Sequence, residues 1–462
     1  MGADRLASDR VRAPRPVLRR RIASGRGATE QPNAASDAPE VHSLRFWVFV
    51  VATGIATGLA GAGTMFLLHA SQHLAFSYTT GEFQAAVERS SWARRLVVLA
   101  IAGVIAGVGW YVTRRVTAGD VAEVHGTIWE GRSDLSLRRS LPSAVLSEIV
   151  VGMGVSLGRE QAPQLLGAVS GSILGGWGRL TPAQRRLLVA CGSGAGLAAV
   201  YNVPIGGALM ISELLYGAIT LTVVLPALVC STIATAVAWI YLPNRATYLH
   251  LASFHFVPTE AVWALLAGPV IGVASVGWTR LVGWTAAHTV SGKVQLVAPL
   301  VAFVALALVG FRYPQLFGNG KDMAHSAFLG QYGILMLFAL FALKPLVTAL
   351  CLGSGASGGL FTPTFSTGAM LGGMLGGLWS LAFHGAPIAA YAVLGAGAML
   401  GAGLQAPLAA IVLTIELTHS TIDLAFPLLV AIGLATITAR YLDGYSIYSS
   451  RLPAHPHGEA AG

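Results

Sequence analysis

Uncharged apolar runs recur along this chain and constrain its fold more than any other feature. Those that approach the ~20 residues of a membrane-spanning helix cover residues 46–68, 96–112, 214–242, 261–279, 294–311 and 326–343. Two longer runs, 345–383 and 385–415, are interrupted by glycine and proline, which is typical of broken helices packed inside protein. The sequence therefore predicts an all-α, polytopic membrane protein.

The low proportion of charged residues agrees with a protein that lies mostly in a membrane. Only 11% of the 462 residues are charged, compared with roughly 25% in soluble domains. The 56 glycines fit the same interpretation, because small residues let neighbouring helices approach closely inside a membrane.

The net charge of +9 does not indicate nucleic-acid binding, because much of the positive charge gathers near the N-terminus. The residues concerned are Arg5, Arg10, Arg12, Arg15, Arg19, Arg20, Arg21 and Arg26. Such a basic end is expected on the cytoplasmic side, and residues 1–43 are expected to form a disordered arm. No short apolar core with a cleavage site precedes residue 46, so we expect no secretory signal.

The cysteines and histidines indicate neither a metal site nor a cofactor. Cys191, Cys230 and Cys351 lie far apart in apolar segments, where small buried side chains are expected. The chain contains no CxxC and no HExxH motif. We therefore expect no metal and no cofactor.

The chain contains an internal repeat. GSGAGLAAVYNVPIGGALMISEL, residues 192–214, aligns without a gap on GAGAMLGAGLQAPLAAIVLTIEL, residues 395–417. Upstream of each copy lies a glycine-rich segment that ends in proline, VSLGREQAP (155–163) in the first half and SGASGGLFTP (354–363) in the second. Broken helices in corresponding halves are typical of transporters, and helix N-termini favour an anionic ligand.

A charged pair, Arg159 and Glu160, interrupts the first glycine-rich segment. Each charge at the bilayer centre costs about 2.5 to 3.5 kcal/mol even on the lenient insertion scale, so we expect the pair to have a use. One interpretation is a buried ion pair that joins helices. Adjacent residues on a helix are poor partners for each other, and the other interpretation is a functional carboxylate.

These motifs closely resemble those of the CLC family of chloride channels and proton-coupled chloride exchangers. CLGSGASGGLFTP (351–363) looks like the family's filter segment, and 400–418 and 196–213 look like its helix pairs. The resemblance spans residues 44–453 and implies two inverted repeats with broken and tilted helices, roughly 44–242 and 257–440. It also implies a pore helix at 445–453, before a short tail at 454–462, and a homodimer with one anion pore in each subunit.

The resemblance also implies functional roles for single residues. The backbone amides of Leu360 and Phe361 would bind the anion, and the Tyr448 hydroxyl would donate to the same ion. Glu160 falls on the gating glutamate. Gly119, in AGDVA, stands where the family usually has a selectivity serine, which predicts weaker discrimination between chloride and nitrate.

The chain departs from the family pattern near the expected proton path. Leu214 stands where many exchangers have an inward-facing glutamate, which leaves Glu213 as the candidate inner proton residue. Glu213 and Glu416 occupy equivalent places in the two repeats, which instead favours a shared structural role such as capping. Gln161 replaces a glycine of the usual motif, and Lys344 is expected to reach the membrane interface.

The expected function is transport of chloride or a similar small anion, gated by Glu160, with proton-coupled exchange favoured by the retained glutamate. The alternatives are a passive chloride channel, which Leu214 favours, and a fluoride-handling variant. A membrane enzyme is disfavoured because the apolar segments offer no convergent catalytic groups, and a scaffold because no sizeable soluble domain occurs. Expected partners are the anion, protons, lipid and a second copy. The expected location is a prokaryotic cell membrane, with both termini cytoplasmic.

Overall fold

The structure is a computed structural model that describes residues 41–117, 124–129, 133–217, 219–383, 385–419 and 422–452. These residues lie in one of the two compact units of the chain, residues 31–462. Apart from its last three residues, the predicted basic arm 1–43 lies outside the described residues, and its disorder stays a prediction. The regular structure of the described part is helical, with one isolated β-bridge.

Six helices of the described residues are long and apolar enough to cross a membrane. They are α1 (Leu44–Phe76), α3 (Trp92–Val116), α9 (Leu221–Ala238), α10 (Pro258–Ala287), α13 (Ile334–Gly353) and α17 (Ala425–Leu442). The predicted runs at 46–68, 96–112 and 261–279 each lie within one of these helices.

The other α-helices cover the connections and the interrupted segments. They are α2 (Phe83–Arg89), α4 (Val124–Trp129), α5 (Leu137–Gly152), α6 (Gln161–Trp177), α7 (Pro182–Tyr201), α8 (Pro204–Met210), α11 (Ala298–Arg312), α12 (Lys321–Phe328), α14 (Phe361–Trp379), α15 (Ile388–Leu404) and α16 (Pro407–Thr418). The predicted interruption of the runs 345–383 and 385–415 is confirmed, since helices end at Gly353 and Leu404 and restart at Phe361 and Pro407.

The two halves of the chain repeat the same packing. Helices α6 and α7 pack together as α14 and α15 do, and α1 packs on α9 as α10 packs on α17. Glycines allow the close crossings: a Cβ at Gly192 would lie 2.1 Å from the Gly167 carbonyl oxygen, and one at Gly395 would lie 2.4 Å from the Gly372 Cα. The repeat in the sequence is therefore also a repeat in three dimensions.

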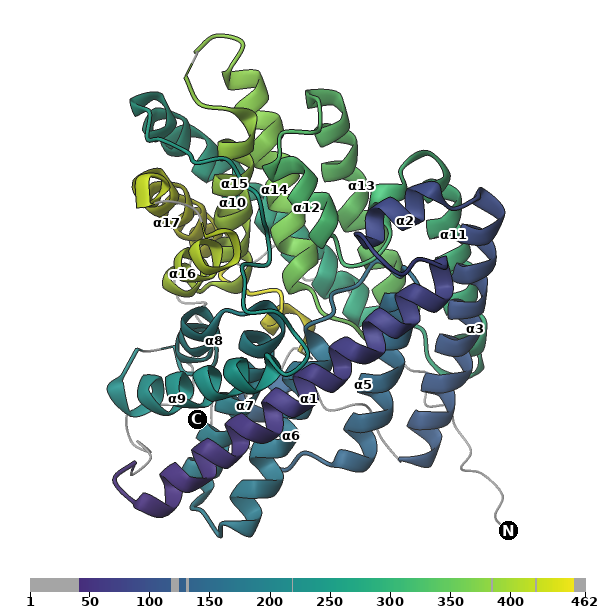
Figure 1. Cartoon of the computed structure of the whole chain (residues 1–462), viewed down its shortest axis with the longest axis vertical. Coiled ribbons are helices and arrows are strands. Elements are labelled where there is room, and N and C mark those ends of the chain that lie inside the picture. The colour runs from purple at the N-terminus through teal and green to yellow at the C-terminus, as the bar shows by residue number, and fades with distance from the viewer. Residues whose placement is uncertain are drawn as a thin grey trace, which may run out of the picture. The chain divides into compact units, whose positions relative to one another are not determined.

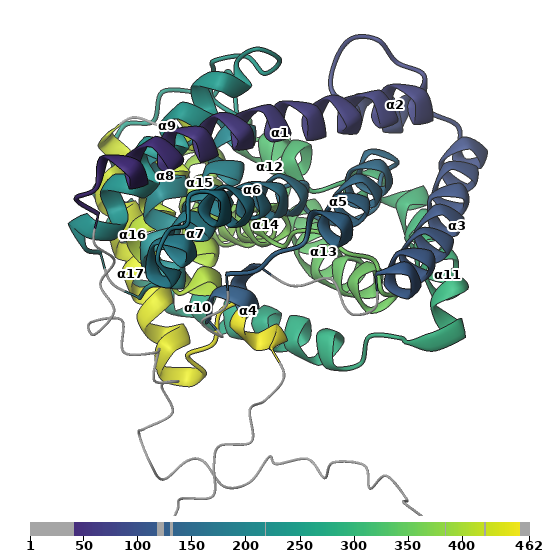
Figure 2. The ribbon, with the colours of Figure 1, turned by 90° about the horizontal axis from the view of Figure 1, so that it is seen from below.

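The arrangement of the helices brings the two interrupted segments together. Helix α1 crosses the front of the described unit diagonally (Figure 1). Both views place α8, α9, α16 and α17 at one end and α3 and α11 at the other, with α6 and α14 between them (Figures 1 and 2). Helices α7 and α15 are buried on all sides along residues 187–201 and 389–404, as expected for helices that are apolar all round.

The predicted single span over 326–343 is wrong. Helix α12 ends at Phe328, and α13 begins only at Ile334. Gly330 lies in the left-handed region with φ +69°, and the Gln331 amide donates to the Ser326 carbonyl oxygen at 2.9 Å. This is the hydrogen bonding by which a glycine ends a helix, and apolar composition alone does not reveal it.

Two further segments differ from expectation. The run at 214–242 contains α9 only from Leu221, after a π-helical turn η1 (Ile211–Leu215). The expected helix 445–453 is, as far as the described Leu452, a single 3-10 turn η5 (Ser449–Arg451). The side chains of Ser446 and Ser449 accept from each other's backbone amides at 3.0 and 2.8 Å, and such local bonds compete with helix formation.

Candidate functional site

The two glycine-rich segments, 155–163 and 354–363, meet each other in the interior. The Gly158 amide donates to the Gly359 carbonyl oxygen at 2.7 Å, and the Gly359 amide donates back to Gly158 at 2.8 Å. These bonds form the isolated antiparallel bridge of the described part. Directly after the bridge, the chain enters α6 in the first half and α14 in the second, so both helix starts lie at one place.

Glu160 carries its carboxylate from the start of α6 to the start of α14. It is the N-cap residue of α6, but its side chain makes no capping bond to its own helix. Instead, Oε1 accepts a hydrogen bond from the Phe361 amide at 2.8 Å. The side chain is fully buried, and it occupies the positive N-terminal end of a helix from the other half.

Two hydroxyl groups complete the surroundings of the carboxylate. The Tyr201 hydroxyl donates to Glu160 Oε2 at 3.1 Å, and Thr362 Oγ1 donates to the same oxygen at 3.3 Å. The two hydroxyls also contact each other. The carboxylate therefore lies in a pocket of three donors, which is the kind of environment that also binds a small anion.

The glycines of the bridge are required by this geometry. A Cβ at Gly158 would lie 2.1 Å from Glu160 Oε1, and a Cβ at Gly359 would lie 1.9 Å from the same atom. Any side chain at either position would therefore compete with the carboxylate for space. The glycine-rich composition of both segments has a steric reason, in addition to the flexibility that glycine provides.

Arg159 and Tyr201 pack together beside the site. The guanidinium carbon of Arg159 lies 4.8 Å from the centre of the Tyr201 ring, an arrangement that stabilises a cation. The same ring lies 5.6 Å from the Phe361 ring, centre to centre. Arg159 thus adds positive charge near Glu160 while it contacts an aromatic face.

The sequence analysis missed Tyr201 and Thr362. One signal could have found Tyr201: in the aligned repeats it falls on Leu404, so a hydroxyl stands in one half where the other half has an aliphatic side chain. Gln161, a departure from the family motif, donates from Nε2 to Ser357 Oγ at 2.6 Å. It ties the start of α6 to the second glycine-rich segment.

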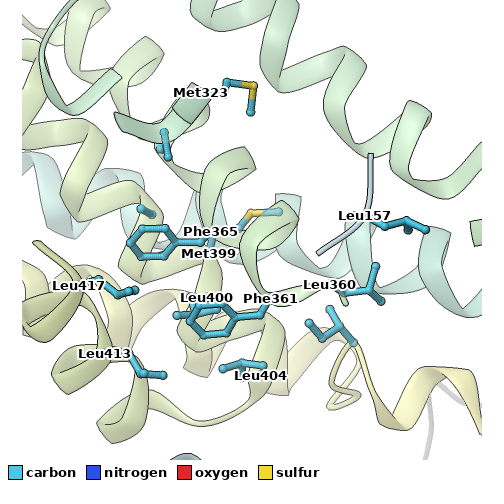
Figure 3. Packing of buried hydrophobic residues seen from close by; sticks show 14 of the residues in the cluster. Leu157, Met323, Leu360, Phe361, Phe365, Met399, Leu400, Leu404, Leu413 and Leu417 are labelled. Carbon is cyan, nitrogen blue, oxygen red and sulfur yellow. The ribbon is translucent and has the colours of Figure 1, made fainter. Parts of the chain in front are cut away.

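Leu360 and Phe361, the expected anion ligands, lie at the start of α14 with 0% and 1% of their surface exposed. Both side chains belong to the apolar core. In Figure 3, Phe361 is drawn with Phe365 of α14 and Leu400 and Leu404 of α15, and Leu360 is drawn toward Leu157. The Phe361 and Phe365 rings are nearly parallel, at 5° and 6.4 Å. The packing leaves the polar contacts of these residues to the backbone, and the Phe361 amide already holds Glu160.

Tyr448 is buried, with 5% of its surface exposed. The neighbouring Ile447 amide donates to the Gly403 carbonyl oxygen at 2.8 Å, which fixes this segment against the end of α15. Side-chain atoms of both Ile447 and Thr364 lie within 3.6 Å of the position that a Cβ at Gly403 would take. The segment that carries Tyr448 therefore lies close to the first turn of α14. Gly119, the expected filter residue, lies outside the described residues.

Glu213 and Glu416 cap each other's half of the molecule. The Glu213 carboxylate accepts from the amides of Leu408 and Ala409, at the start of α16, at 3.2 and 2.6 Å. The Glu416 carboxylate accepts from Ile205 and Gly206, at the start of α8, at 3.1 and 2.7 Å. The geometry is that of the capping role which the repeat indicated.

The expected position of Lys344 at the membrane interface is wrong. Lys344 is fully buried, and its Nζ donates to Ser156 Oγ and the Gly318 carbonyl oxygen at 2.8 Å each, and to the Leu316 carbonyl oxygen at 3.4 Å. These acceptors come within reach only because distant segments fold around α13. The Lys344 side chain thus supports the first glycine-rich segment through Ser156.

The described residues contain no group of three or more metal-ligating side chains. Cys191, Cys230 and Cys351 are buried and unpaired with one another. The site itself is made of backbone amides, hydroxyls, the basic side chains of Arg159 and Lys344, and the Glu160 carboxylate. Such a set can bind an anion and exchange a proton.

Comparison with known proteins gives a consistent result. The family model described as voltage gated chloride channel matches residues 102–440. A putative chloride channel protein ClcB-like from Ralstonia nicotianae is 33% identical over 377 residues, which cover 78% of this chain and 86% of that protein. The H(+)/Cl(-) exchange transporter ClcA of Yersinia pestis is 27% identical over 368 residues, which cover 76% of each.

A solved structure has the same fold. The crystal structure of a slow cyanobacterial Cl-/H+ antiporter superposes with a TM-score of 0.76 at 24% identity, and the match covers 88% of this chain and 96% of that one. The predicted all-α, multi-pass fold of CLC type is confirmed. The chain belongs to the voltage-gated chloride channel family, the CLC family that its motifs resemble.

Proposed function

We propose that this protein moves chloride, or a similar small anion, across a membrane through a path that Glu160 closes, and that anion movement is coupled to protons. The single observation that carries the proposal is the bond from the Phe361 amide to Glu160 Oε1 at 2.8 Å. It places a carboxylate on the backbone donor where the resemblance puts the anion. Relatives named as a chloride channel and as a proton/chloride exchanger support the choice of ion.

The mechanism follows from competition for the start of α14. While Glu160 is ionised, its carboxylate accepts from the Phe361 amide and from the hydroxyls of Tyr201 and Thr362. When a proton binds the carboxylate, the charge that the helix terminus favours is lost, and the side chain can leave. An anion then accepts from the same donors, and deprotonation returns the carboxylate.

Coupling arises because the proton and the anion act on one group. A proton on Glu160 opens the donors to the anion, and departure of the anion lets the ionised carboxylate return. A second candidate is a passive channel, which the buried Leu214 favours because its side chain cannot carry a proton. Glu213 stays the candidate inner proton residue of the sequence analysis, although its contacts with α16 favour a capping role.

The test compares wild type with Glu160→Gln in liposomes, with chloride efflux and external pH recorded together. The amide mimics the protonated acid at nearly constant volume, so we expect anion flux to persist, to lose its pH dependence and to drive no proton movement. Glu260→Gln is the matched control, because Glu260 is also fully buried but caps α10 through Val257. A Glu160→Gln protein that keeps the wild-type pH profile would contradict the gating role.

We also propose a cell-membrane location with both termini cytoplasmic, lipid around the spanning helices, and a homodimer. Support for lipid contact comes from exposed aliphatic side chains on these helices, such as Leu59 (53% exposed), Leu265 (55%) and Leu346 (57%). Ile205 and Leu408 are each 49% exposed at the starts of α8 and α16, at the end of the described unit that also carries α9 and α17 (Figure 1). Burial of this apolar end supports pairing with a second copy.

A further inference from the structure

Glu148, on α5, is a buried carboxyl group that the anion path does not use. It is 0% exposed, and neither Oε1 nor Oε2 has a hydrogen-bond partner among the described residues. The other fully buried glutamates differ in this respect, since Glu160 accepts three bonds and Glu260 caps α10. Glu148 therefore requires an explanation of its own.

A role in holding the fold does not explain Glu148. Buried polar groups are stabilising only when they are hydrogen-bonded, and a carboxylate that bonds to nothing destabilises the structure around it. Lys344 shows the contrast, because its ammonium group makes three hydrogen bonds and joins three segments. Groups that lack such bonds in native proteins call for another role.

Among the described residues, the charged groups of Arg159 and Glu160 are near enough to Glu148 to act on it electrostatically. Helix α5 packs against α1, α3 and α6, and α6 starts directly after this charged pair. Glu148 and Glu160 are thus two carboxyl groups of one electrostatic system in the protein interior. Two carboxyl groups that interact in this way can share a proton between them.

Other polar groups mark a route along α5 to Glu148. Ser140, Ser143 and Ser147 are at most 2% exposed and lie on one helical face by their spacing of three and four residues, and Glu148 follows Ser147 directly in the chain. Ser147 Oγ has no hydrogen-bond partner in the described part of the chain. The same holds for Gln164 Nε2, one turn after Glu160. Buried polar atoms of this kind are the partners that internal water molecules need.

We propose that Glu148 is a second proton-carrying residue, which receives a proton along the serine face of α5 and passes it to Glu160. The inference rests on the proposed proton coupling. In the transfer, the O–H bond at Glu148 breaks as an O–H bond forms at Glu160, by way of water between them. Glu148 is left ionised in the field of Arg159 until a proton from solution restores it, so no oxidant or reductant is needed.

The experiment uses the full chain in liposomes with an outward chloride gradient, and it records chloride and proton movement together. Glu148→Gln keeps the volume and removes the titratable group, so we expect chloride flux to remain and uphill proton movement to be lost. Glu148→Asp keeps a carboxyl group, so we expect this variant to retain the proton movement that Glu148→Gln loses. Glu260→Gln is the matched control for a buried carboxyl changed to an amide, and it should keep the wild-type ratio of protons to chloride.

A second variant separates the relay from a structural role. Glu148→Met replaces an unbonded polar group with an apolar one of similar length, so we expect Tm to stay the same or rise while proton movement is lost. A lowered Tm together with loss of all flux would overturn the inference in favour of a structural role. Proton movement that survives in the Gln variant would also overturn it, while leaving the gating role of Glu160 intact.

The wild type distinguishes the inference from the function on which it rests. Chloride flux without any proton movement in wild-type liposomes would overturn the relay and the proton coupling, but not the anion path. Absence of chloride flux would overturn the proposed function, and the relay with it. Proton movement in the wild type that is lost in both the Gln and Met variants would support the relay.

Discussion

The starts of α6 and α14 are equivalent in the repeat, but one carries a hydrogen-bond acceptor and the other supplies the donor. Each follows a glycine-rich segment, and the two segments pair through Gly158 and Gly359. The start of α6 carries Glu160, whose side chain makes no bond to its own helix. The start of α14 carries apolar side chains and a backbone amide that receives Glu160. One half supplies a carboxylate, and the other supplies the backbone amide that binds it.

The starts of α8 and α16 show the opposite relationship. Each is capped by a glutamate from the other half, Glu416 on α8 and Glu213 on α16. The backbone around the two glutamates differs, because Glu213 lies in the π-helical turn η1, but the capping is reciprocal. Where the two halves keep the same side chain they hold each other together, and where they differ they form the candidate site.

The largest expected effect comes from crowding the side chain of Glu160, the proposed gate. In Gly359→Ala the new Cβ would lie 1.9 Å from Glu160 Oε1, and the flexible carboxylate should move away before the backbone does. Because hydrogen bonds to charged groups contribute about 1.5 to 3 kcal/mol each, we expect chloride efflux at neutral pH to rise by about tenfold or more and to lose its pH dependence. Gly277→Ala, which meets nothing within 4 Å, is the control, and an unchanged pH profile in Gly359→Ala would contradict the geometry.

A smaller effect is expected from removing the hydroxyl of Tyr201, which the equivalent Leu404 of the second half also lacks. Tyr201→Phe removes one donor to the ionised Glu160, worth about 1.5 to 3 kcal/mol. The gate should therefore open more readily, and chloride efflux at neutral pH should increase about tenfold. Tyr111→Phe on α3 serves as the control for loss of a tyrosine hydroxyl. Slower efflux in Tyr201→Phe would show that the hydroxyl stabilises the bound anion more than it stabilises the ionised Glu160.

The reciprocal caps provide a test of the symmetric pair. Glu213→Gln and Glu416→Gln each weaken one helix cap, worth about 0.5 to 2 kcal/mol, so we expect similar small decreases in Tm. Both variants should keep the wild-type ratio of proton to chloride movement in liposomes. If Glu213→Gln alone lost proton movement, Glu213 would be the inner proton residue and the symmetry of the pair would be broken.

The smallest effect is expected at Tyr448, which lies in the segment 445–453 after the second repeat. Tyr448→Phe removes one neutral donor, worth a net ~0.5 to 1.5 kcal/mol, so chloride affinity should fall by up to about tenfold while Tm stays the same. Isothermal titration calorimetry measures this change. Tyr445→Phe, an exposed tyrosine of the same segment, is the control, and an unchanged isotherm for Tyr448→Phe would remove Tyr448 from the anion site.

Much of the architecture followed from local pattern. Long apolar runs predicted the spanning helices α1, α3 and α10, and glycine with proline predicted the interruptions before α14 and α16. The pattern failed at 326–343, because the turn at Gly330 is made by backbone hydrogen bonds within an otherwise apolar sequence. The helix at 445–453, which the family resemblance implied, is also absent as far as the described Leu452, because Ser446 and Ser449 bond to the backbone and favour a turn.

The sequence by itself determined that this chain is a helical membrane protein with two related halves, and that Glu160 stands in an apolar setting where a charge is costly. Composition and repeat are properties of neighbouring residues, so they can be read along the chain. Only the tertiary structure decided that Glu160 lies on the Phe361 amide, 201 residues away, that Tyr201 and Thr362 bond to it, and that Lys344 and Glu148 are buried. Those outcomes depend on how the two halves pack against each other, and the pairing of distant backbone donors with a carboxylate has no local signature.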